Sequence, residues 1–265
     1  MDKLTLPKAR IWAPRWVRVV FAMMLREMAT TYGRSSLGYM WAIIEPVGAI
    51  AVLSIAFSIA LQNPALGQSF ALFYATGYMP FMLYNTMQNR IGATVRENKQ
   101  LLFYPRVTYV DAMIARFILT FVTQLFVAVI VFGGIIVMDG VNQRLDFMLI
   151  FSALLIAAVL GLGVGVLNCI LIHLMPSWRQ LWSVFTRPLF LVSCIFFMFD
   201  NLPIWAQKVL WFNPLVHIVG LMRRGFYTIY EGDYIVLAYP LAITGLTLFF
   251  GLALLRRYSQ DLINS

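Results

Sequence analysis

The fold is decided by one stretch near the start of the chain, which reads Arg26-Glu27, then Tyr32-Gly33-Arg34-Ser35-Ser36-Leu37-Gly38, then Trp41-Ala42-Ile43-Ile44-Glu45-Pro46. Basic residues come first, a glycine follows, and a tryptophan, a carboxylate and a proline stand where an apolar run begins. Arginine and tryptophan favour the interface between lipid headgroups and hydrocarbon. The stretch therefore predicts a helix on a membrane surface that leads directly into a helix that crosses the bilayer.

The composition of the whole chain also indicates an integral membrane protein. Of its 265 residues, 61% are hydrophobic and only 12% are charged, and the mean hydropathy is +0.80. Soluble domains carry about 25% charged residues, so this chain has little surface suited to bulk water. The first ten residues contain no apolar core and no small-residue cleavage site, and we expect no cleaved signal peptide.

Apolar segments of about 20 residues suffice to cross a hydrocarbon core about 30 Å thick, and six segments reach that length. They are residues 37–61, 70–89, 107–138, 147–175, 181–199 and 234–255. We expect an all-α membrane protein of six transmembrane helices in one domain, 1–265, with an interfacial segment 1–36, a membrane domain 37–255 and a tail 256–265. Residues 201–217 are too short and too often interrupted by proline to cross, and they predict re-entrant or interfacial helices.

The distribution of lysine and arginine predicts the orientation, because basic residues in short flanking segments stay in the cytoplasm. With both termini cytoplasmic, the inner segments hold seven, four, two and two of the twenty basic residues. These segments are 1–45, 90–106, 176–187 and 256–265. The outer segments 62–69, 139–146 and 200–233 hold four basic residues together. The net charge of +9 thus reflects topology and does not indicate a nucleic-acid partner.

Residues 14–33 predict one helix, since proline favours a first turn and glycine follows a last one. Arg15, Arg18 and Arg26 share a face of this helix, opposite a series of apolar residues, as in helices that lie in the headgroup plane. Two interpretations remain open. The helix only anchors the chain, or its arginines bind the phosphate of a lipid or substrate, which a planar guanidinium pairs with two bonds.

Residues 92–104 form a polar-then-apolar segment on the predicted cytoplasmic side. The polar half is Arg96-Glu97-Asn98-Lys99, and Leu101-Leu102-Phe103-Tyr104 follow before Pro105. A short helix of this kind is suited to a groove on a soluble partner. A plain loop is the alternative.

Four blocks of the chain, in order, resemble the permease subunit of bacterial ABC exporters for capsular polysaccharide, of the ABC-2 type. The first is the opening stretch, and the second runs from Asn98, Leu101, Leu102, Tyr104 and Pro105 to Asp111 and Arg116. The third contains Trp182, Arg187-Pro188-Leu189-Phe190 and Ser193-Cys194-Ile195-Phe196-Phe197, and the fourth contains Leu202-Pro203 and Asn213-Pro214-Leu215-Val216-His217 up to Arg223. The blocks span most of the chain.

The resemblance implies a homodimer of permeases with two ATP-binding-cassette subunits in the bacterial inner membrane, where the 92–104 helix is the coupling helix. The implied coupling residues are Arg96, Glu97, Asn98, Lys99, Leu101, Leu102, Phe103 and Tyr104. Of the four lysines, none precedes a serine or threonine, so the chain has no Walker A motif and ATP with its Mg²⁺ would bind to the partner ATPase. The implied substrate is a lipid-linked polysaccharide, with periplasmic and outer-membrane export proteins as further partners.

We expect the substrate to enter between the surface helix and the first span. Rings stack on the C–H faces of sugars and arginines pair with anions. The candidate pathway residues are Arg15, Arg18, Arg26, Arg34, Tyr39, Trp41, Tyr84, Trp182 and Arg187. Charges within a span, such as Arg116, require a partner or water, and simple ion pairing is the alternative to function there.

Other functions fit the sequence less well. A membrane enzyme acting on lipid-linked sugar requires a catalytic cluster, yet His173 and His217 fall on opposite sides of the predicted membrane. Cys169 and Cys194 lack metal-binding spacing, and we expect neither a catalytic nor a metal site. The glycines from Gly161 to Gly165 lie within a span and predict close helix packing instead of a phosphate loop. Permeases for O-antigen, teichoic acid, lipids or drugs share the expected architecture and stay open.

Overall fold

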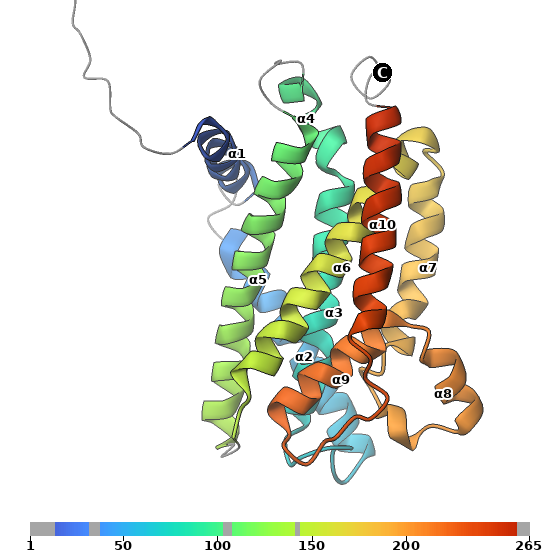
Figure 1. Ribbon diagram of the computed structural model, residues 1–265. Coiled ribbons are helices and arrows are strands. Elements are labelled where there is room, and N and C mark those ends of the chain that lie inside the picture. The colour runs from blue at the N-terminus through green and yellow to red at the C-terminus, as the bar shows by residue number, and fades with distance from the viewer. Residues whose placement is uncertain (1–13, 32–37, 103–107, 141–143, 259–265) are drawn as a thin grey trace, which may run out of the picture.

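The computed structural model describes residues 14–31, 38–102, 108–140 and 144–258, and every regular element in these ranges is a helix (Figure 1). The long helices are α1 (Arg15–Thr31), α2 (Gly38–Ala60), α3 (Phe70–Gly92), α5 (Tyr109–Asp139), α6 (Phe147–Leu174), α7 (Trp178–Val192) and α10 (Ala238–Arg257). The short ones are α4 (Thr94–Leu102), the 3₁₀ helix η1 (Phe199–Asn201), α8 (Ile204–Leu210) and α9 (Pro214–Phe226).

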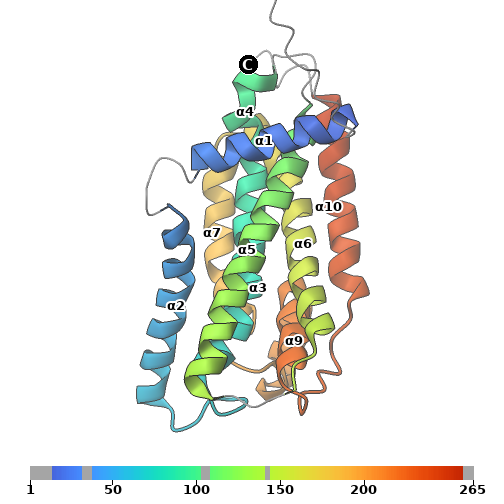
Figure 2. The same cartoon turned by 90° about the vertical axis from the view of Figure 1, so that its left-hand side faces the viewer.

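The long helices form a bundle whose two ends differ. At one end α1 lies across one side of the bundle, and α4 and the C-terminal end of α10 lie at the same end (Figure 1 and Figure 2). The loop after α2 and the C-terminal end of α5 lie at the opposite end, together with α8 and α9 (Figure 1). The segments rich in lysine and arginine therefore share an end of the bundle, as the charge pattern predicts.

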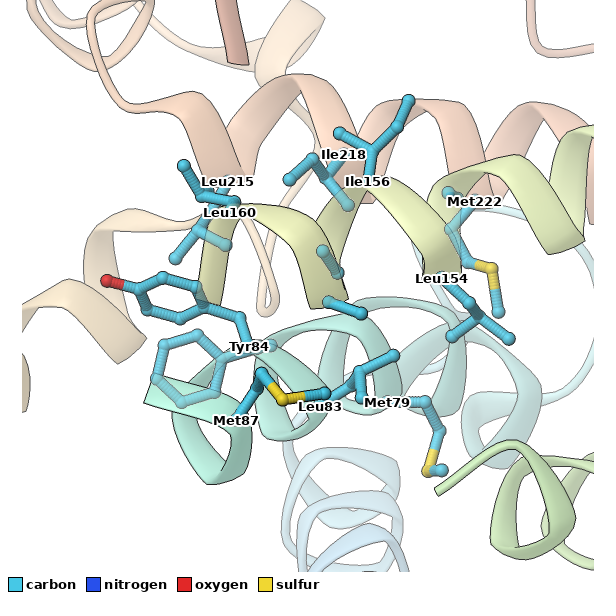
Figure 3. Packing of buried hydrophobic residues seen from close by; sticks show 14 of the residues in the cluster. Met79, Leu83, Tyr84, Met87, Leu154, Ile156, Leu160, Leu215, Ile218 and Met222 are labelled. Atoms are coloured by element: carbon cyan, nitrogen blue, oxygen red, sulfur yellow. The ribbon is translucent and has the colours of Figure 1, made fainter. Parts of the chain in front are cut away.

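Glycines allow the central helices α3 and α6 to approach closely, as expected for the run from Gly161 to Gly165. A Cβ at Gly161 would lie 2.8 Å from the Cβ of Met87, and one at Gly165 would lie 2.7 Å from the Cβ of Ile91. Gly163 lies on the other side of α6, against the backbone of α10 at Thr244. Figure 3 shows the resulting core, in which side chains of α3, α6 and α9 interleave.

Among the residues that the structure describes, four helices are long and apolar enough to cross a membrane: α2, α5, α6 and α10. Helix α3 has the length but less hydropathy, because it lies in the middle of the bundle, where 15 of its 23 residues are buried. The predicted bounds of the fifth span, 181–199, differ from those of the helix found there. Helix α7 runs from Trp178 to Val192, about 22 Å at 1.5 Å per residue, and the chain then turns at Cys194, whose φ is 57°.

The segment expected to hold re-entrant or interfacial helices contains two of different character. Helix α9 is almost entirely buried, and its Asn213 cap accepts from the backbone N–H of Leu215 at 3.0 Å. Helix α8 instead exposes Ile204, Trp205 and Val209. Protein surrounds α9, as a re-entrant helix needs, and α8 has the exposed apolar side chains of an interfacial helix, while their depth in a membrane stays a prediction.

Candidate functional site

A buried arginine of α5 contacts three other helices, α1, α3 and α4, at the end of the bundle that carries α1 and α4. The Nη2 atom of Arg116, on α5, lies 3.0 Å from Glu27 Oε1 on α1 and 2.7 Å from Glu97 Oε2 on α4. Its Nη1 atom donates to the backbone carbonyl of Arg90 at 3.0 Å. The sequence indicated that Arg116 needs a partner, but Glu27 lies 89 positions away and no local spacing points to it.

A second contact joins α1 and α4 directly, through the residues next to Glu27 and Glu97. Arg26 Nη2 donates to Asn98 Oδ1 at 2.6 Å, and Asn98 Nδ2 donates to the backbone carbonyl of Thr94 at 3.0 Å. Asn98 is buried, so its side chain faces the permease and not a soluble partner. Arg26 is partly exposed and donates to α4, and its expected place on the substrate pathway stays a prediction.

The predicted coupling segment is helical from Thr94 to Leu102, so the loop alternative is wrong for this part. Arg96 is exposed and lies 3.5 Å from Glu97, whose side chain is half-exposed. The backbone of α4 is helical through Leu102. The side chains of Lys99, Leu101 and Leu102, and the whole of Phe103 and Tyr104, lie outside the described part of the chain.

Helix α1 has two apolar sides. Val20 and Met23 pack against Ala112 and Ala115 of α5, while Trp16, Val17, Phe21 and Leu25 are exposed. Arg18 is exposed as well. The side chain of Arg15 and all of Arg34 lie outside the described residues. A helix fixed along one side, with apolar and basic side chains on the others, is suited to a lipid surface.

A cavity of about 940 Å³ opens between α3, α6 and α7 near the α4 end. Its lining combines rings, amides and cations. The lining includes Phe81, Gln88, Asn168, Arg179, Trp182 and Arg187. Trp182 and Arg187 were predicted pathway residues, and the structure brings them together here.

Hydrogen bonds between amides and indoles fix the shape of the cavity wall. Gln88 Oε1 accepts from Trp182 Nε1 at 2.7 Å and from Asn168 Nδ2 at 3.2 Å. Asn168 Oδ1 accepts from Trp178 Nε1 at 2.9 Å, and the two indoles are stacked with centroids 6.1 Å apart. Rigid rings beside hydrogen-bonding amides and exposed arginines suit a sugar that carries negative charge. Sequence reasoning missed Gln88, Asn168 and Trp178 as site residues. The amides of Gln88 and Asn168 within apolar helices were a signal that could have pointed to this site.

Two other predicted aromatic residues, Tyr84 and Trp41, do not line this cavity. Tyr84 is 4% exposed and packs in the core of α3 and α6, as Figure 3 shows. Its expected place on an open pathway is therefore corrected for the single chain. Trp41, on α2, is 64% exposed. The side chain of Tyr39 lies outside the described part.

A second buried arginine lies at the opposite end, on α9. Arg223 donates through Nη1 to the carbonyl of Phe197 at 2.9 Å and through Nη2 to that of Ile195 at 3.1 Å. The phenols of Tyr230 and Tyr234 lie 2.9 Å apart nearby. Burial raises the pKa of Tyr230 to about 12, so this phenol stays neutral and supplies no countercharge. Backbone dipoles therefore stabilise the guanidinium.

The histidines are separated, as predicted. His173 lines the cavity, whereas His217 lies buried on α9, where its Nε2 is 2.9 Å from the carbonyl oxygen of Trp211 and its Nδ1 accepts from the N–H of Val236 at 3.2 Å. Within the described residues, no cluster of three histidine, cysteine or acidic side chains is placed to hold a metal.

Residues 18–227 match the family described as ABC-2 type transporter. The chain belongs to that family. It is 32% identical over 251 residues to the polysialic acid transport protein KpsM of Escherichia coli, covering 93% of this chain and 95% of that protein. It is also similar to the capsule polysaccharide export inner-membrane proteins CtrC of Neisseria meningitidis serogroup A, at 25% identity, and BexB of Haemophilus influenzae, at 26%, each covering 92% of both chains.

Family membership confirms the resemblance carried by the four sequence blocks. The chain is the membrane subunit of an ABC-2 type transporter and not its catalytic ATPase. This membrane subunit then has two candidate functional sites. One is the ion-paired cluster of α1, α4 and α5, and the other is the cavity between α3, α6 and α7.

Proposed function

We propose that this chain is the permease subunit of an ATP-driven exporter that moves a lipid-linked capsule polysaccharide across the bacterial inner membrane. The observation that carries the proposal is the likeness to three capsule transport proteins over more than nine-tenths of the chain. The cavity supports it, since its rings, amides and arginines match the chemistry of an acidic glycan.

The proposed assembly contains two copies of this chain and two ATPase subunits, which bind ATP and Mg²⁺ and dock on α4. Six crossings are proposed, with α3 and α7 added to the four apolar helices. Both termini, α1 and α4 face the cytoplasm, because basic residues resist translocation. Periplasmic and outer-membrane partners would receive the polysaccharide.

Deletion of the gene in its own host tests the proposal. We expect surface capsule to disappear and lipid-linked polysaccharide to accumulate inside the cell. A plasmid copy should restore export, Trp182→Ala should lower it at least fivefold, and Trp205→Ala, an exposed tryptophan at the other end, should restore it fully. Normal capsule in the deletion strain would overturn the proposal. Retention of O-antigen or teichoic acid instead would assign the permease to that glycan.

A further inference from the structure

The cluster around Arg116 is built asymmetrically. The Arg116 side chain is 4% exposed and that of Glu27 is 9% exposed, so this pair lies inside the protein. Glu97 is 49% exposed and contacts the same nitrogen from the outside. Separating Arg116 from Glu27 leaves a buried charge without its partner, which is costly, whereas a departing Glu97 is readily hydrated.

This asymmetry gives the three helices different strengths of attachment. Helix α1 is tied firmly to α5 by the buried pair and by Val20 and Met23 packed on Ala112 and Ala115. Helix α4 is tied to α5 through the contact of Glu97 with Arg116, and directly to α1 through the bond from Arg26 to Asn98. The two contacts lie at consecutive positions on each helix, so together they prevent α4 from rotating against α1.

We propose that Arg116 is a positioning residue that holds α4 to α1, so that the two helices move as one body. The inference rests on the proposed function, in which α4 receives the ATPase. The surface helix α1 is then a driven part of the transporter and more than an anchor. Movement of α4 by the ATPase would shift α1 in the headgroup plane.

Two conservative variants remove the same contact from opposite sides. Glu97→Gln leaves the buried pair of Arg116 and Glu27 intact, so the protein should fold. Arg116→Lys keeps the charge, but the lysine side chain ends in a single ammonium group. That group cannot contact two carboxylates and a carbonyl at the positions that the forked guanidinium reaches. Because both changes remove the same contact, the double variant should be no worse than the more severe single one. Glu231→Gln, an exposed carboxylate at the opposite end, is the matched control.

Spin labels at Met28 on α1, Gln100 on α4 and Leu246 on α10 report the movement in the permease–ATPase complex in lipid nanodiscs. In the parent we expect a narrow α1–α4 distance distribution that stays constant when ATP and vanadate are added, while the α1–α10 distance shifts. In Glu97→Gln the α1–α4 distribution should broaden at least twofold without nucleotide, and the nucleotide-dependent shift of α1 should fall by at least half.

An unchanged α1–α4 distribution in Glu97→Gln, or additive effects in the double variant, would overturn the inference. So would an α1 that stays still in the parent while α4 moves relative to α10. A separate measurement tests the proposed function: if that function is wrong, no ATPase should co-purify with the parent chain. The α1–α4 width, measured without nucleotide, still decides the inference in that case.

Discussion

The guanidinium of Arg223 lies 4.3 Å from the centre of the Phe73 ring, so that α9 and α3 meet through a buried cation and an aromatic face. The same guanidinium donates to the backbone that follows α7. One side chain thereby holds the turn at Cys194 against the base of the bundle. A cation is suited to this task because it satisfies several carbonyl groups at once and is attracted to the ring.

Replacing this arginine should loosen the end of α7. We expect Arg223→Lys to lower the free energy of unfolding by about 2–3 kcal/mol, because one ammonium cannot reach both carbonyl groups, and bonds from charged donors contribute about that much. Thermal unfolding in detergent measures the change. Arg224→Lys, at the exposed neighbouring position, should melt like the parent, and equal melting of the two variants would contradict the role of Arg223.

Close packing of α6 on α3 gives a second prediction. Gly165→Ala should destabilise the protein by about 1–3 kcal/mol, since its new Cβ would press on Ile91 and on the carbonyl of Gln88. Gly245→Ala on α10 is the control, because a Cβ there meets no atom within 4 Å. The melting temperature should fall only in the first variant, and a Gly165→Ala protein as stable as the parent would refute the close approach.

The cavity wall should depend on the amide of Gln88. In Gln88→Leu the donors of Trp182 and Asn168 lose their acceptor, at a cost of about 1–3 kcal/mol for each buried donor. We expect a lower melting temperature and a shift in tryptophan fluorescence as the stacked indoles move. Gln180→Leu, at an exposed position of α7, should change neither signal. Unchanged fluorescence in Gln88→Leu would argue against a fixed wall.

The orientation is open to chemical labelling in intact cells. Single cysteines at Gln68 and Arg144 should react with an impermeant maleimide from the periplasm, whereas Lys99→Cys should react only after the inner membrane is opened. The buried Cys169 and Cys194 give little background. Reaction of Lys99→Cys in intact cells would reverse the proposed topology.

Docking of the ATPase on α4 predicts the effect of charge at its apolar end. Aspartate at both Leu101 and Leu102 should abolish co-purification of the ATPase and export, because two carboxylates would have to be buried in the groove. The amount of permease in the membrane should not change. A doubly substituted permease that still retains its ATPase would show that another surface binds it.

Several features follow from the sequence because they depend on neighbouring residues. The surface helix, predicted over 14–33, is observed as α1 over Arg15–Thr31, since its proline and glycine boundaries are local signals. The glycine run in α6 predicted close packing for the same kind of reason. Apolar length predicted four helices that the structure also has as candidate spans.

The tertiary structure decided the contacts between distant residues. Hydropathy described α3 as a span like the others, but the burial of α3 in the bundle explains why it tolerates Gln88, whose amide oxygen accepts from Trp182 and Asn168. The end of α7 at Val192 depends on carbonyl groups held by Arg223, which belongs to another helix.

The sequence by itself determined the class of the protein, the gathering of basic segments at one end and the surface helix, because these follow from composition, charge order and the pattern of neighbouring residues. Only the tertiary structure paired Arg116 with Glu27 and Trp182 with Gln88, 89 and 94 positions apart. A buried charge or amide requires a partner, but burial does not specify which partner. The packing of the helices supplies it.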